Sequence, residues 1–296
     1  MTLTSFRVIT FRAVTWLAFA TACTSEGPEC EETADCVARC ERMGTCPDGP
    51  LECVAGICQE RDRWDCERQL VVPNDVTIQI RMRAMEGFDQ IPVPSEVTVC
   101  EYRDIDCNAP VAGPFVSESA PPHYVDFEVA SRPGLYLEIR PTEDLDGMTL
   151  LPSIVDFDDT AALSAEFGTS GVAYNLLTTE SLNFYADAGS IGLDPALGMV
   201  FGGIDTCEIG VGGEGLSVRP LELPETSVWY LRGVPRFDGE TAADGRWGMV
   251  NVPSGAWTFE ILDGAEVVGT IRRIARGGWR TEALYLPYVV RESEGS

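Results

Sequence analysis

Lysine is missing from this 296-residue sequence, and histidine occurs once, as His123. A Ser-His-Asp or Cys-His catalytic arrangement would have to use His123, and no G-x-S-x-G motif is present to accompany it. The cysteines form no C-x-x-C pair, the spacing that zinc sites commonly use. We therefore expect a loop or core position for His123, no cofactor and no metal site.

Positive charge is also scarce, because 21 basic residues face 47 acidic ones and the formal net charge is -26. So acidic a chain repels phosphate backbones, which argues against nucleic acid as a partner. Solubility of an exported protein is a sufficient reason for the acidity.

Residues 1–22 contain no apolar run long enough to span a bilayer, because Ala13 to Ala22 is far shorter than the ~20 residues that a span needs. Arg7 and Arg12 come before this run and small residues come after it. That order is typical of an export signal peptide, which is removed and takes no part in the fold.

The sequence Ala20-Thr21-Ala22-Cys23 resembles a bacterial lipobox, with Ala20 where leucine is commonest. The resemblance implies a lipid on Cys23, which would anchor the chain to a bilayer of the cell envelope, with the outer membrane as the expected location. Residues 23–29 would then be a tether. The alternative is ordinary cleavage after Ala22, which would leave Cys23 for a disulfide.

Cysteine parity favours lipidation, because eleven cysteines without Cys23 leave an even ten. Residues 30–65 are too short to bury a core, so we predict a small disulfide-rich segment there. The cluster comprises Cys30, Cys36, Cys40, Cys46, Cys53, Cys58 and Cys66, and its odd number requires a partner outside it. Cys100 and Cys107 flank a short loop and suit a local bridge, which leaves Cys207 for Cys66. The rival pairing joins Cys207 to Cys100 or Cys107, and the pairing inside the cluster stays open.

The pattern from Thr241 to Ile261 predicts a strand, a turn at Pro253-Ser254-Gly255 and a second strand. Trp257, Phe259 and Ile261 alternate with polar or small residues, as in a half-buried antiparallel strand. We expect Trp257 in the core, where truncation to alanine would cost about 3–5 kcal/mol. Similar alternation predicts strands over 76–84 and 97–102, and a strand pair over 124–139 around Pro133-Gly134.

Between these β regions, Thr178 and Gly189 are start and stop signals for a helix over 179–188. Strands at short spacing with Gly and Pro turns predict a mainly β fold of two tandem Ig-like or transthyretin-like β-sandwiches. We expect the first sandwich over 66–157, a connector with the short helix over 158–197, and the second sandwich over 198–292.

The strand–turn–strand pattern after Thr241 resembles the central hairpin of carboxypeptidase-regulatory-like, transthyretin-type sandwich modules. A series of short motifs between Trp64 and Val289 resembles a group of Cys-rich lipoproteins from myxobacteria and related bacteria. The resemblance implies tandem transthyretin-like sandwiches on a lipid anchor and no known catalytic activity. The motifs are Trp64-Asp65-Cys66, Val97-x-Val99-Cys100 with Cys107, Tyr136-Leu137-Glu138-Ile139, Asp205-Thr206-Cys207, Asn251-Val252-Pro253-x-Gly255, and Val268-Gly269 with Arg276-Gly277.

Two groups of residues suggest ligands. Asp156, Asp158 and Asp159 have the spacing of a calcium loop, although a solvated acidic turn explains them as well. Trp229 and Tyr285 are the aromatic residues that strand alternation places towards solvent, where flat rings would suit a sugar.

The favoured function is therefore a non-enzymatic, envelope-anchored lipoprotein with a structural or binding role, whose partner is a glycan or an envelope protein. One alternative is a carbohydrate-binding surface lipoprotein. The other is a secreted hydrolase that uses paired carboxylates.

Overall fold

The computed structural model describes residues 35–36, 38–39, 42, 51–54, 57–60 and 64–292, except 146, 189–190, 224–227, 233 and 238. The chain divides into two compact units, Met1–Arg61 and Asp62–Ser296. In the described part of the first unit, β1 (Leu51–Val54) and β2 (Ile57–Glu60) form an antiparallel hairpin. Cys58, on β2, forms a disulfide with Cys36. No helix among the described residues has the length and apolar character of a bilayer span.

Several sequence predictions lie outside the described residues. They are the signal peptide over 1–22, the lipid attachment site Cys23, the tether over 23–29, and the side chains of Cys30, Cys40, Cys46 and Cys53.

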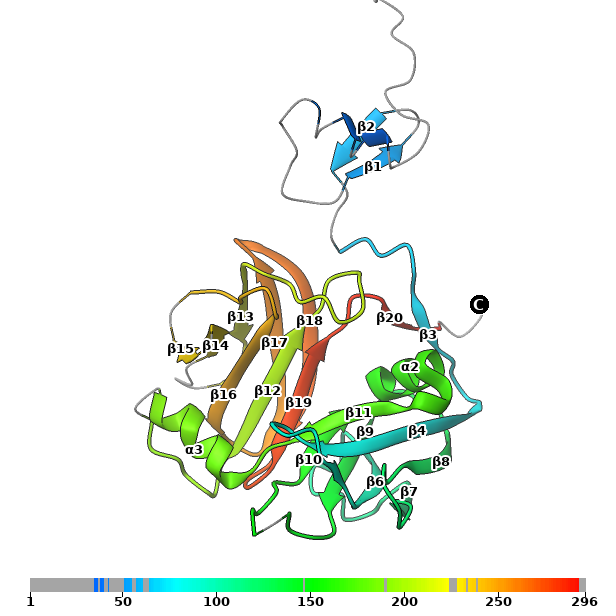
Figure 1. Ribbon diagram of the computed structural model, residues 1–296, viewed down its shortest axis with the longest axis vertical. Helices are drawn as coiled ribbons and strands as arrows, with labels where there is room; N and C mark the ends of the chain where they lie inside the picture. The colour runs from blue at the N-terminus through cyan, green and yellow to red at the C-terminus, as the bar shows by residue number, and fades with distance from the viewer. Residues whose placement is uncertain are drawn as a thin grey trace, which may run out of the picture. The chain divides into compact units, whose positions relative to one another are not determined.

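The second unit is mainly β and consists of two sandwiches that share one nine-stranded sheet (Figure 1). The strand order in this sheet is β15-β14-β16-β12-β19-β10-β9-β6-β7. The bounds are β6 (Ser95–Glu101), β7 (Ala112–Val116), β9 (Leu135–Pro141), β10 (Ser153–Asp156), β12 (Gly198–Ile204), β14 (Trp229–Arg232), β15 (Val234–Arg236), β16 (Arg246–Val252) and β19 (Arg280–Tyr285).

The first sandwich places strands β10, β9, β6 and β7 against a four-stranded sheet. Alternating apolar residues of β4 (Thr77–Glu86), β6 and β9, such as Met82, Val97 and Leu137, are fully buried between the two layers. Helix α2 (Phe157–Phe167) buries Phe157 and Leu163 in the same core and is followed by the short helix η1 (Gly168–Ser170). The four-stranded sheet comprises β4 (Thr77–Glu86), β5 (Pro92–Val93), β8 (Val125–Ala130) and β11 (Val172–Leu176).

The second sandwich places strands β19, β12, β16, β14 and β15 against β13 (Leu216–Pro220), β17 (Gly255–Asp263) and β18 (Glu266–Ala275). Trp247, Phe259 and Ile261 are completely buried between these layers. The predicted connector helix is α3 (Thr179–Ala188), which begins and ends at the expected residues. It covers the outer face of the large sheet, where Tyr185 stacks on Trp229 with ring centroids 5.1 Å apart.

Both expected strand pairs contain the predicted strands, but neither is a hairpin. β16 pairs with β12 and β14, whereas β17 pairs with β13 and β18. In the same way, β8 pairs with β4, whereas β9 pairs with β6 and β10. Each turn therefore carries the chain from one layer of a sandwich to the other. Alternation identifies a half-buried strand but does not say which layer it joins, and this is why the pairing was predicted wrongly.

Main-chain pairing connects the two sandwiches at two places. β10 of the first sandwich runs parallel to β19 of the second, with Ser153 opposite Arg280. After β19, the chain returns as β20 (Val289–Arg291) to pair with β3 (Leu70–Val72), which precedes the first sandwich. The stretch expected as a connector also contains α2 and β11, and both pack with the first sandwich. The two sandwiches are therefore fused.

Trp257 lies on the predicted face of β17, but its ring is only partly buried against the core of the second sandwich. Its indole N–H donates to the Pro253 carbonyl at 2.8 Å. Because part of the ring stays in solvent, we expect Trp257→Ala to cost about 2–3 kcal/mol, less than a full core truncation. The midpoint of urea unfolding measures this cost, and an unchanged midpoint would show that the ring contributes nothing to the core.

Candidate functional site

The junction between the two sandwiches contains an unusual amount of buried charge. Three arginines, which are Arg273, Arg276 and Arg280, come from one stretch at the end of β18 and the start of β19, and all are buried. Each donates hydrogen bonds to groups of the first sandwich. Buried cations need partners, so these contacts tie the position of one sandwich to the other.

Arg273 is deeply enclosed, with 8% of its side chain exposed. Its guanidinium lies 3.2 Å from Asp156 and 2.6 Å from Asp159, which both belong to the first sandwich. Tyr102 donates its hydroxyl proton to Asp156 at 2.9 Å. The result is a buried group of two carboxylates, one guanidinium and one phenol.

The calcium hypothesis for Asp156, Asp158 and Asp159 is not supported, because each carboxylate has an arginine partner. Asp156 also caps α2 by accepting the backbone N–H groups of Asp158 at 2.9 Å and Asp159 at 3.1 Å. Asp158 pairs with Arg291 on β20. The expected solvated acidic turn is instead a helix start whose carboxylates are part of the junction.

Burial and, after it, the neighbouring Asp156 charge raise the pKa of Asp159 to about 7, although Arg273 opposes both. The folded pKa lies above the ordinary value of 3.8, so protonation stabilises the fold. This contribution is fully present below the unfolded pKa and is lost as the pH rises through about 7.

We expect the wild-type protein to lose stability relative to Asp159→Asn between pH 5 and pH 8. Urea midpoints across this range measure the difference, and a difference independent of pH would contradict the expectation.

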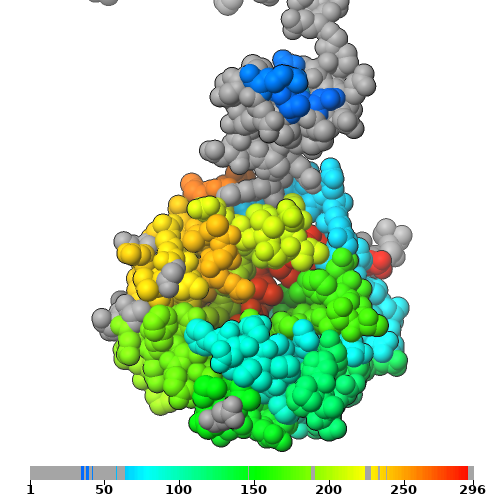
Figure 2. Space-filling view, in the orientation of Figure 1, coloured from blue at the N-terminus to red at the C-terminus, as the bar shows by residue number. Residues whose placement is uncertain are grey.

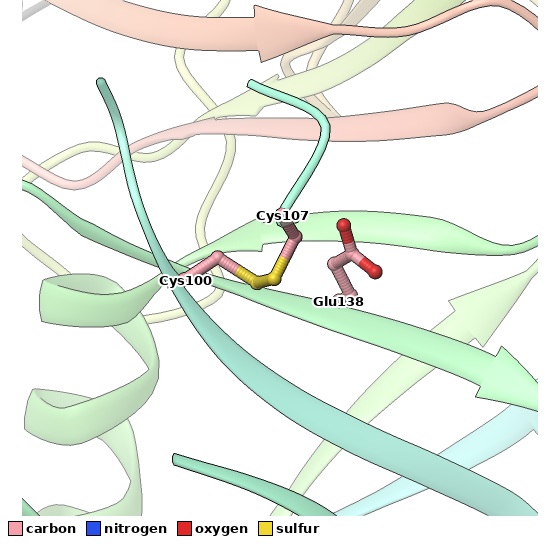
Figure 3. Close-up of side chains that lie close together, drawn as sticks. All are labelled: Cys100, Cys107 and Glu138. Atoms are coloured by element: carbon pink, nitrogen blue, oxygen red, sulfur yellow. A yellow bond between two sulfur atoms is a disulfide. The ribbon is translucent and has the colours of Figure 1, made fainter. Parts of the chain in front are cut away.

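Arg276 and Glu138 form a second buried pair, with the guanidinium 2.5 Å from the carboxylate. Arg276 also donates to the Tyr136 hydroxyl at 3.0 Å and lies over the ring of Trp279. Figure 3 shows Glu138 beside the disulfide that joins Cys100 to Cys107. These three residues are the one group of potential metal ligands within reach of one another among the described residues. Oxidation removes both thiolates, so the group is a structural one.

The disulfides at the junction are the two that parity and loop length predict. Cys66 is bonded to Cys207, and Cys100 is bonded to Cys107. The Cα atoms of Cys66 and Cys207 are 5.0 Å apart, although 141 residues separate them in sequence. This bond fastens the segment before the first sandwich to the second sandwich.

The junction also has an open side, where β19 lies at the bottom of a cleft. Figure 2 shows red atoms of this part of the chain in a hollow between yellow-green and green segments. The cleft consists of two pockets, of about 200 Å³ and about 380 Å³, which share Asn175, Arg246 and Arg280. The smaller pocket has aromatic walls from Tyr185, Phe201 and Trp229, whereas the larger one includes the carboxylates of Asp205 and Glu282.

The predicted ligand-facing rings do not face solvent as expected. Trp229 is 1% exposed, because α3 covers it and its ring lies across Gly248, so this prediction is wrong. Tyr285 is partly buried, and its hydroxyl donates to the Val268 carbonyl at 2.7 Å. A side chain at Gly269 would clash with this ring, so the ring packs on its own sandwich. His123 is buried in a loop, and its Nδ1 donates to the Glu118 carbonyl at 2.8 Å.

The fold and its junction define a mainly β protein of two fused sandwiches. The sequence matches no described protein family and no curated protein. Among solved structures, it is similar to a streptococcal ancillary pilin, with 13% identity over 81% of this chain and 71% of that one, at a TM-score of 0.23. It is also similar to the shaft pilin SpaA from Lactobacillus rhamnosus GG, with 9% identity over 70% and 96% of the two chains and a TM-score of 0.21. A minor pilin of Streptococcus agalactiae is also similar, with 8% identity over 74% of this chain and 98% of that one, and a TM-score of 0.22.

Proposed function

We propose that the chain is a non-enzymatic, envelope-anchored lipoprotein in which two fused sandwiches serve a structural or binding role. The observation that carries this proposal is the junction, where a shared sheet, buried ion pairs and the Cys66–Cys207 bond hold both sandwiches as one body. Rigid bodies of this kind suit the presentation of a surface or a cleft to a partner. The lipobox-like sequence before Cys23 and the resemblance to Cys-rich lipoproteins support the envelope location.

We expect the mature protein to begin at Cys23 and to carry acyl chains there. Intact-mass spectrometry of protein extracted from membranes measures both the N-terminus and the added lipid. Cys23→Ser should move the protein from the membrane fraction to the soluble fraction. A mature chain with an unacylated N-terminus would contradict the anchor and leave the description of the sandwiches intact.

The carbohydrate-binding alternative depends on exposed aromatic rings. No tryptophan or tyrosine among the described residues is an exposed side chain, and Trp229 is buried. A flat stacking platform for neutral sugars therefore finds no support in the described part of the chain.

The hydrolase alternative requires two carboxylates in one cleft, and Asp205 and Glu282 meet that condition. Burial raises the pKa of Asp205, as a general acid would need. Both carboxylates, however, have structural partners: Asp205 accepts from Gly210 N at 2.9 Å and from the Tyr288 hydroxyl at 3.2 Å, and Glu282 pairs with Arg280.

An assay with 4-nitrophenyl glycosides tests the non-enzymatic proposal directly. We expect no release of 4-nitrophenol above the buffer rate. Hydrolysis that Asp205→Asn abolishes, while the variant keeps the wild-type unfolding midpoint, would contradict the proposal and assign the cleft to catalysis.

A further inference from the structure

The smaller pocket of the cleft combines aromatic walls with two guanidiniums. Tyr185, Phe201 and Trp229 pack around one another with ring centroids between 4.7 and 5.1 Å apart. Arg280 lies at 5.9 Å from the Phe201 ring centroid, and Arg246 completes the wall. With a volume of about 200 Å³, the pocket has room for one ring-sized group, since an apolar cavity of about 150 Å³ holds benzene.

The positive charge in this pocket is incompletely neutralised, which is notable in a chain with a net charge of -26. Arg280 pairs with Glu282 and donates to the Asn175 carbonyl at 2.6 Å, but its buried Nε has no partner among the described residues. Arg246 is exposed and has no ion pair within the described part of the chain. Asp244 is the one carboxylate that lines this pocket. Burial, and after it the charge of Arg246, lowers the pKa of Arg280 to about 9, so an anion between the two arginines would stabilise both charges.

A hydrogen-bond donor in the pocket wall also lacks an acceptor. The indole N–H group of Trp229 is buried without a partner among the described residues. Trp247 also borders the pocket, but its indole lies on the other face of the sheet, between the layers of the second sandwich. Buried donors are nearly always satisfied, so a ligand acceptor is the natural counterpart of the Trp229 indole.

An exposed phenylalanine forms the lip of the pocket. Phe88 is 65% exposed and belongs to the turn between β4 and β5 of the first sandwich. The buried carboxylate of Glu86 fixes this turn by accepting the N–H groups of Phe88 at 2.9 Å and Asp89 at 2.6 Å. The first sandwich therefore holds an apolar side chain at a pocket whose charged residues come from the second.

We propose that this pocket binds a small aromatic carboxylate, with its ring against Phe201 and Trp229 and its carboxylate towards Arg246 and Arg280. Arginine suits the planar carboxylate, and the indole donor of Trp229 suits one of its remaining lone pairs. The proposal rests on the binding role proposed above and names its ligand class. The carboxylate belongs either to a free aromatic acid or to the C-terminal residue of a peptide.

Titration with phenylacetate tests the proposal on the intact mature chain, with ¹⁵N–¹H spectra of the tryptophan indoles as the readout. We expect the indole signal of Trp229, assigned with a Trp229→Phe variant, to shift saturably, and the neutral isostere phenylacetamide to bind at least about tenfold more weakly. N-acetylphenylalanine is the second probe: tighter binding than phenylacetate assigns a peptide C-terminus, and weaker binding assigns a free acid.

Arg246→Gln is the informative variant, because Arg246 is exposed and its loss should leave the fold intact. We expect it to weaken phenylacetate binding about tenfold or more, the loss that one charge-assisted contact produces. Arg236→Gln is the matched control, since Arg236 is also exposed, lies on β15 at the edge of the same sheet and does not line the pocket. Equal binding of phenylacetate and phenylacetamide, no shift of the Trp229 indole, or equal losses in the two arginine variants would overturn the proposal. Any of these results leaves the lipid-anchor test at Cys23 unaffected.

Discussion

Replacing Arg273 with alanine should destabilise the second unit by about 3–5 kcal/mol, the cost of leaving buried charges without a partner. Asp156 and Asp159 would lose their common guanidinium while remaining largely enclosed. The cap on α2 would also weaken, because Asp156 holds the first turn of that helix. Urea unfolding, followed by tryptophan fluorescence, measures the change in the free energy of unfolding.

Arg272→Ala is the control for this variant. Arg272 is the preceding residue on β18 and carries the same charge, but its side chain is exposed. We expect a change within about 0.5 kcal/mol, as for an ordinary surface substitution. Equal losses in the two variants would show that the charge group at the junction contributes little to stability.

Removing the disulfide between Cys66 and Cys207 by substituting both residues with alanine is the second change with a large expected effect. The bond closes a loop of 141 residues, for which the chain-entropy model gives a stabilisation of about 4–5 kcal/mol. In this model the stabilisation from a disulfide falls only slowly as its loop becomes shorter. Comparing the unfolding of variants that lack a long-loop or a short-loop disulfide therefore tests the model better than one value does.

The Cys100–Cys107 bond provides that comparison, because it spans only seven residues. The same model gives about 2–3 kcal/mol for its removal. We therefore expect the Cys66 and Cys207 double variant to unfold at a lower urea concentration than the Cys100 and Cys107 double variant. The reverse order would mean that the long-range bond does not restrict the unfolded chain as the model requires.

Sequence patterns predicted much of the fold, because they depend on local physics. The period of two located strands such as β4, β6 and β17, and helix signals located α3 residue for residue. Parity and loop length were sufficient for the two disulfides that involve cysteines beyond the cluster. Pairing was less predictable, because alternation gives one buried face without naming the neighbouring strand. The parallel pair of β10 with β19 joins residues more than 120 positions apart and has no local signal.

The site was harder to predict than the fold. The stretch from Arg272 to Arg280 contains four arginines. Arginine side chains are mostly exposed in folded proteins, so the sequence alone predicts a solvated surface here. Three of them are buried, because the first sandwich supplies Asp156, Glu138 and the Asn175 carbonyl from distant parts of the chain. Trp229 was assigned to solvent because its strand has one face outside the sandwich, but α3 covers that face. Four arginines close together where one strand ends and the next begins are the signal that could have indicated the junction.

The central claim is that the two sandwiches form one cooperative body, and native-state hydrogen exchange at low urea concentrations tests it most directly. Amides of β9 report on the first sandwich and amides of β16 report on the second. If the shared sheet and the buried arginines fuse the sandwiches, both sets should exchange with the same free energy of opening and the same dependence on urea. If the amides of one sandwich exchange with a clearly lower free energy of opening than those of the other, the sandwiches are two independent domains and the claim is contradicted.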